Sequence, residues 1–113
     1  IIRKYKEIEP RARFFVVTMP RGLRDDTLSD KHREIMYAMA EKFDNCYVID
    51  LREYGPEIDE EYRKNFFIAG HRTATGYRLT ALMVESYIDY IIRNNPEDFK
   101  QVSFIGTPYY YEK

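Results

Sequence analysis

Two short apolar runs constrain the fold more than any other feature of this sequence. Residues 14–18 read Phe-Phe-Val-Val-Thr, and residues 47–49 read Tyr-Val-Ile. Neither run alternates apolar with polar side chains, which is typical of a strand that is covered on both faces. The segment between the runs is long enough for a helical crossover, which parallel strands require. The runs therefore predict two strands of a parallel α/β sheet.

The rest of the chain predicts helices around these strands. Thr27 or Ser29 can cap the helix between the runs, and Leu28, Ile35, Met39 and Phe43 form its apolar stripe. A helix over residues 77–94 is apolar on most of its circumference, so we expect several neighbours to bury it. The remaining expected elements are a helix ended by Pro10, a short helix within residues 57–65, a turn starting at Pro96 and a third strand over residues 102–105.

This order of elements predicts one unit over residues 1–113 with a doubly wound parallel sheet. The fold class is α/β, a three-layer α/β/α arrangement of the flavodoxin-like type. Two or three strands make a thin sheet, and the first residue is Ile rather than Met. We therefore expect the chain to represent the C-terminal strands and helices of a larger domain.

Composition excludes several classes of partner and cofactor. Hydrophobic residues make up 44% and charged residues 33%, a globular composition with a net charge of −1 and interspersed signs, so no nucleic-acid partner is expected. No apolar run approaches the ~20 residues of a membrane span, and no signal-peptide pattern is seen. The single cysteine, Cys46, implies no oxidising compartment. The compartment stays open, and the lack of a signal-peptide pattern favours a cytoplasmic location. No phosphate loop or metal-ligand spacing occurs, so no cofactor or metal is predicted; His32 does not begin a zinc motif.

His71 is the strongest candidate for chemistry. It lies between Gly70 and Gly76 in a stretch of small residues just before the long helix. A histidine there can accept and donate a proton near neutral pH, or it can simply cap the helix or bridge two loops.

Residues 70–79, Gly-His-Arg-Thr-Ala-Thr-Gly-Tyr-Arg-Leu, resemble the last block of SGNH/GDSL-type hydrolases. Residues 86–93 and 99–107 resemble the C-terminal end of a bacterial branch of that family, and the two apolar runs match its last two central strands. The resemblance covers nearly the whole chain but only the second half of the family's domain. It implies a serine esterase or acylhydrolase in which His71 is the general base and acid. The implied substrate is a small-molecule carboxyl ester, such as an acetylated carbohydrate.

Two departures from the family limit this implication. The Gly-Asp-Ser block with the nucleophile and the oxyanion-hole Gly and Asn are absent, and none of the three serines lies on a strand-to-helix elbow. The position three residues before the histidine, usually Asp in the family, is Ile68. Asp50, at the end of the second run, is a candidate orienting acid, although a turn-capping role is the alternative.

Two arginines on the loop after the first run, Arg21 and Arg24, are candidate substrate-binding residues, the alternative being solvated loop arginines. A cluster of the carboxylates of Asp25, Asp26 and Asp50 would indicate a receiver-like fold, but Gly106-Thr107 stands where that fold has Lys.

The alternative function is a catalytically inactive α/β module that binds a partner or oligomerises. We expect the chain to form a homo-oligomer or to associate with a missing N-terminal half, since an unpaired strand edge favours pairing.

Overall fold

The computed structural model describes residues 1–99, so the strand expected over residues 102–105 lies outside the described residues. The helices are α1 (Ile2–Ile8), α2 (Asp26–Lys42), α3 (Leu51–Tyr54), α4 (Glu60–Phe66), α5 (Ala74–Asn94) and α6 (Pro96–Phe99). The strands are β1 (Phe14–Val17), β2 (Cys46–Ile49), β3 (Phe67–Ile68) and β4 (His71–Arg72). The mixed α/β class expected from the sequence is confirmed.

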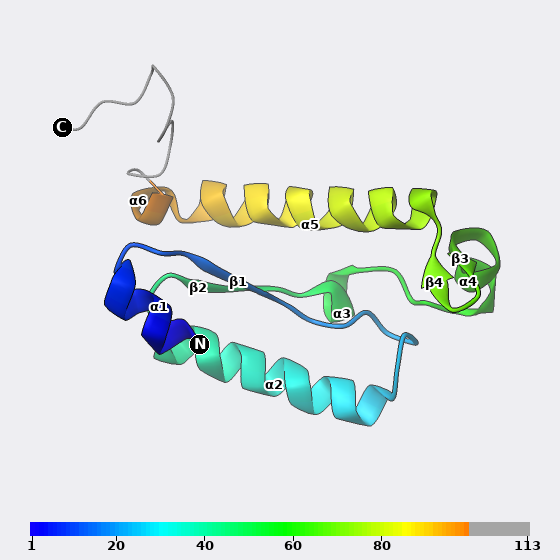
Figure 1. The fold of residues 1–113 in the computed structure, drawn as a ribbon, viewed down its shortest axis with the longest axis horizontal. Coiled ribbons are helices and arrows are strands. Elements are labelled where there is room, and N and C mark those ends of the chain that lie inside the picture. The colour runs from blue at the N-terminus through cyan, green and yellow to red at the C-terminus, as the bar shows by residue number, and fades with distance from the viewer. Residues whose placement is uncertain (100–113) are drawn as a thin grey trace, which may run out of the picture.

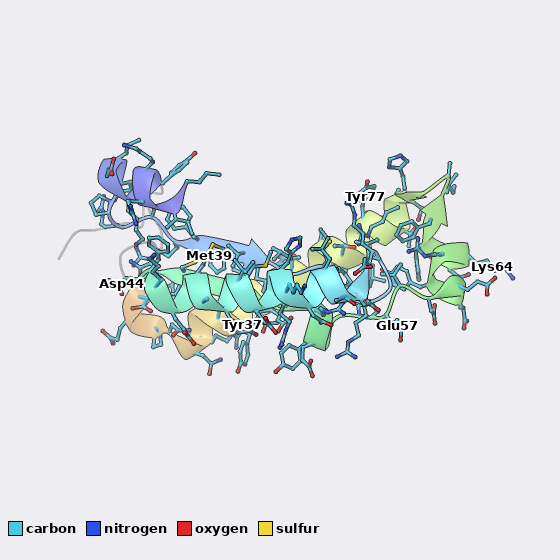
Figure 2. All side chains as sticks on the ribbon, turned by 90° about the horizontal axis from the view of Figure 1, so that it is seen from below. Tyr37, Met39, Asp44, Glu57, Lys64 and Tyr77 are labelled. Carbon is cyan, nitrogen blue, oxygen red and sulfur yellow. The ribbon has the colours of Figure 1, made fainter. Side chains whose placement is uncertain are left out.

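The two apolar runs form the predicted parallel pair. β1 and β2 align with Phe14 opposite Cys46 and Val17 opposite Ile49. In Figure 1 the pair lies between two long helices, with α2 on one side and α5 on the other. Figure 2 views the molecule from the α2 side and shows α5 behind the sheet. β1 and β2 thus have a helix over each face.

The core lies between the sheet and α5. Its buried members are Ile49, Leu51, Ile91 and Phe99. Phe99, at the end of α6, packs against the rings of Phe15 and Tyr47, with centroid distances of 6.2 and 5.4 Å. The last turn of the described chain therefore closes the core at the amino end of the strands.

Several local predictions need correction. Asp25, rather than Thr27 or Ser29, caps α2, because its carboxylate accepts the backbone N–H of Leu28 at 2.8 Å. Leu28 and Ile35, expected on the apolar stripe of that helix, are exposed. α3 was not predicted, and α5 begins at Ala74 because Thr73 accepts the N–H of Gly76.

The composition of α5 suggested that neighbours would bury it on all sides, but the structure buries only part of its circumference. The face with Val84, Ile88 and Ile91 packs on the core, but Leu82 and Tyr90 remain exposed. Among residues 1–99, the sheet and α3 lie along the helix, α4 and β4 contact its first turns and α6 its end, and these elements cover only part of it. The rest of its apolar surface has no neighbour among residues 1–99.

Candidate functional site

The stretch with His71 forms a β-hairpin that the sequence did not predict. β3 and β4 pair antiparallel, with Ile68 opposite His71 and Phe67 opposite Arg72. Ala69 and Gly70 connect them with φ of 49° and 82°. Positive φ at both positions of a two-residue loop matches the type I′ turn, which suits the twist of a hairpin. Gly70 therefore serves the turn, and His71 follows it directly.

The hairpin is held between α4 and α5 by one carbonyl group. The backbone oxygen of Phe66 accepts the N–H of Thr73 at 2.8 Å. The same oxygen lies so close to Gly76 that a Cβ there would come within 2.6 Å of it. Gly76 is thus required for the close approach of α4 to the first turn of α5. This contact fixes both ends of the segment that carries His71.

A single arginine of α4 links this region to the loop after β1. Arg63 on α4 donates to the carbonyl oxygen of Gly22 at 2.7 Å. Its guanidinium and that of Arg72 both lie over the ring of Phe67, at 5.3 and 5.5 Å from the centroid. In Figure 1 the hairpin and α4 lie at the end of the molecule toward which β1 and β2 run. His71, in β4, thus lies beyond the carboxyl ends of β1 and β2, on a hairpin joined through Arg63 to the loop after β1.

The His71 side chain is exposed and makes no hydrogen bond or ion pair with any of residues 1–99. It is therefore neither a helix cap nor a bridge within the described structure, since Thr73 caps α5. Its neighbour across the hairpin, Ile68, is 71% exposed and provides no polar group. The imidazole is free to contact a group from outside residues 1–99.

Asp50 lies in a separate buried cluster. Its carboxylate is completely buried and accepts hydrogen bonds from Thr18 Oγ1 at 3.0 Å, from Arg33 Nε at 2.8 Å and from Tyr37 Oη at 2.7 Å. It also caps α3 by accepting the N–H of Glu53. None of these partners is His71, so the structure does not bring the two candidate residues together. The capping role is the one that the contacts show.

The electrostatics of this cluster keep Asp50 ionised. Burial alone would raise its pKa, but hydrogen bonds from Arg33, Tyr37 and Thr18 outweigh burial and hold the pKa below the usual value. Burial and the hydrogen bond to Asp50 raise the pKa of Tyr37 to about 12. Sequence reasoning missed Thr18, Arg33 and Tyr37. The signal was available, because Thr18 and Asp50 directly follow residues that are opposite each other in the two strands.

A second ion cluster joins the same elements. Arg52 on α3 is buried and pairs with Asp26 and Asp30 on α2, at 2.9 Å for Asp26. The two carboxylates raise the pKa of Arg52, Asp30 contributing most. Both clusters fix the start of α3 against α2. They provide structural order rather than an open site.

The two candidate substrate-binding arginines differ. Arg21 donates to the carbonyl oxygen of Arg52 at 3.1 Å and pairs with Glu53 at 3.4 Å, so it holds the loop to α3. Arg24 is exposed, and no hydrogen bond or ion pair engages its side chain within residues 1–99. Of the two, Arg24 is the one whose guanidinium has no hydrogen bond or ion pair within residues 1–99.

Metal binding and membrane insertion were also assessed on residues 1–99. No three His, Cys, Asp or Glu side chains there are grouped so that they could hold a metal ion. None of the described helices combines the length and apolarity needed to cross a membrane.

No protein-family model matches this chain, and neither a curated protein nor a solved structure shows significant similarity to it.

Proposed function

We propose that this chain is the C-terminal part of an SGNH-type carboxyl-ester hydrolase in which His71 is the general base and acid. The observation that supports the proposal is the exposed His71 side chain, unpartnered within residues 1–99, on a hairpin that lies beyond the carboxyl ends of two parallel strands (Figure 1). Ligands of open α/β sheets bind outside the carboxyl ends of the strands. The resemblance of residues 70–79 to the family's last block supplies the reaction type.

In this proposal the serine comes from a segment outside the chain. His71 accepts the serine proton during attack on the ester carbonyl and donates it to the leaving alkoxide, and a water then releases the acyl group by the same route. The carboxylate of Asp50 is bound by Arg33 and Tyr37 and does not orient His71. We therefore propose that the catalytic residues are a Ser–His dyad, formed by the upstream serine and His71. Arg24 is the better placed of the two arginines to contact a polar or anionic part of the substrate. An acetylated carbohydrate is the substrate class we propose.

The unpaired edge of β1 is an observation in favour of a larger, three-layer fold with a doubly wound sheet. The N–H groups of Phe14 and Thr18 donate to Asn45 and Ile49, at 2.8 and 3.0 Å. Alternate residues of a parallel strand bond to opposite sides, so Phe15 and Val17 present their backbone groups to the other edge. The two-stranded sheet of residues 1–99 leaves that edge unpaired. We propose that the strands of the N-terminal half continue the sheet there.

The test uses a protein in which this chain follows its upstream sequence. His71→Ala is expected to abolish hydrolysis of 4-nitrophenyl acetate, whereas His32→Ala, which removes another exposed histidine, leaves the rate unchanged. Labelling with a fluorophosphonate, located by mass spectrometry, is expected to mark a serine upstream of Ile1. Full activity in His71→Ala would reject the proposal.

A second function, an inactive module that associates through its open surface, is favoured by a different observation. Val17, next to the unpaired backbone of β1, is 40% exposed although it lies in a buried-type strand. An apolar edge of this kind promotes pairing with another strand. Fluorophosphonate labelling distinguishes the two functions, because an inactive module would contain no serine that reacts with the label. Loss of self-association in Val17→Lys would support it.

A further inference from the structure

A groove of about 630 Å³ lies between α3 and α5, on the flank of α5 beside β2 rather than at the hairpin with His71. Leu51 and Tyr54 line it from α3, and side chains between Leu82 and Tyr90 line it from α5. We call it the α3–α5 groove. It is a second surface, separate from the candidate site.

The lining is apolar and aromatic. Tyr54 and Tyr87 have ring centroids 6.1 Å apart, and Tyr87 and Tyr90 are also 6.1 Å apart. These three rings form a row from one helix to the other, and Leu82 beside them is 59% exposed. None of the lining residues, all of them within residues 1–99, is acidic or basic. Burial of these exposed apolar side chains under another segment would be favourable in water.

The sequence beyond α6 has matching chemistry. Residues 101–111, Gln-Val-Ser-Phe-Ile-Gly-Thr-Pro-Tyr-Tyr-Tyr, form the longest stretch of the chain without Asp, Glu, Lys or Arg. An uncharged segment enters an uncharged groove without desolvating an ion, whereas a charged segment would lose that hydration. Its aliphatic and aromatic side chains are those that pack on rows of tyrosine rings.

The segment begins at a position from which it can reach the groove. Phe99 is buried in the core together with Ile91, near the end of α5. Leu82 lies nine residues before Ile91 on the helix, a rise of about 14 Å. Residues 100–113 can span roughly 45 Å when extended. The segment is therefore long enough to return along α5 to the far end of the groove.

We infer that residues 101–111 bind in the α3–α5 groove of the same chain. Three observations support this: the groove is apolar, the segment is uncharged, and the segment begins close to the end of α5. The segment covers Tyr54, Leu82 and Tyr90, with Phe104 and Ile105 as its main contacts. This inference assigns residues 102–105 to the groove in place of the strand expected from the sequence. It is independent of the proposed ester hydrolysis, and its test needs no enzymatic activity.

Hydroxyl-radical footprinting of the full chain gives the first test. Phe104→Asp combined with Ile105→Asp is expected to raise the oxidation of Tyr54, Leu82 and Tyr90 and to leave Ile35 unchanged. Ile35 is a matched reference, because it is 57% exposed but lies on α2, on the other side of the sheet. Unchanged oxidation of the groove side chains would overturn the inference.

The reciprocal test changes the groove and observes the tail. Leu82→Glu is expected to accelerate chymotrypsin cleavage at Tyr109, Tyr110 and Tyr111, whereas Ile35→Glu leaves the rate as in the unaltered chain. Both positions are exposed, so neither substitution disturbs the core. Equal rates in the two variants would contradict binding. Groove protection that disappears on dilution would show that the segment comes from a second copy, and this too would overturn the inference.

Discussion

Ile68 and His71 face each other across the two-residue turn of the β3–β4 hairpin. Directly opposite residues of an antiparallel pair have Cβ atoms about 5 Å apart on the same face. The position three residues before the histidine is therefore the place from which a carboxylate would reach the imidazole. In this chain an exposed Ile side chain occupies it.

Ile68→Asp is accordingly expected to orient His71. The carboxylate would accept the Nδ1 proton and fix the tautomer in which Nε2 is the base. We expect ¹⁵N chemical shifts of His71 to move toward the Nδ1–H tautomer, and the rate of the serine-containing protein to rise by about tenfold. Ile68→Asn is the control of similar shape, and an equal effect of both variants would show that charge is not the cause.

Gly76→Ala is expected to destabilise the chain although alanine favours helices. In an open helix the change would gain about 1 kcal/mol. Here the new Cβ would lie 2.6 Å from the Phe66 carbonyl oxygen, so overpacking dominates and we expect a net loss of about 2 kcal/mol. Urea denaturation measures this, with Thr75→Ala, at an exposed neighbouring position, as the control. A gain in stability would mean that α4 does not press on α5.

Ala69→Asn is expected to stabilise the hairpin locally. Ala69 has a φ of 49°, a conformation that costs an L residue with a Cβ about 1 kcal/mol and that Asn tolerates better. Hydrogen exchange at the N–H of Thr73, which bonds to Phe66, should slow by about threefold. Ala69→Val, which tolerates a positive φ poorly, should accelerate the same exchange.

Asp50→Asn is expected to lower the free energy of unfolding by about 3 kcal/mol. The substitution leaves Arg33 and Tyr37 without their anionic acceptor, and removing one partner of a buried charged cluster costs this much. Asp89→Asn is the control, because Asp89 pairs with Arg93 at 2.8 Å on an exposed helix face. Its loss should stay below about 0.5 kcal/mol.

Acid should remove the contribution of Asp50. Its folded-state pKa lies below the usual 3.8, so the unfolded chain takes up this proton at higher pH than the folded chain does. Stability from Asp50 is thus complete above about pH 5 and is lost as the pH falls from about 4 through the folded pKa. The difference in unfolding free energy between the unaltered chain and Asp50→Asn should shrink over that interval. A difference that stays constant down to pH 2 would refute this assignment.

The strands β1 and β2 and the long helices α2 and α5 could be predicted because their signals are local. The apolar runs around Val16 and Val48 and the periodicity before Ile91 needed no knowledge of distant residues. The hairpin could not be predicted in this way, since β3 and β4 have two residues each and depend on the contact of Gly76 with Phe66.

The candidate site was only partly accessible from sequence. The flanking residues made His71 a candidate, and this role stays a prediction; the structure shows that its side chain is exposed on a hairpin. The roles of Asp50 and Arg21 depend on partners many residues away, namely Arg33 and the α3 backbone. Burial of Leu28 and Ile35 was overestimated, because periodicity indicates which side of a helix is apolar and not whether a neighbour covers it.

The packing of Phe99 on Phe15 and Tyr47 has a consequence during protein synthesis. β1 leaves the ribosome before α5 does, and the ring that completes its core arrives only after the whole of α5 has been made. Until then Phe15 and Tyr47 are open to solvent and to chaperones, and a nascent chain stalled within α5 lacks the contact that closes its core.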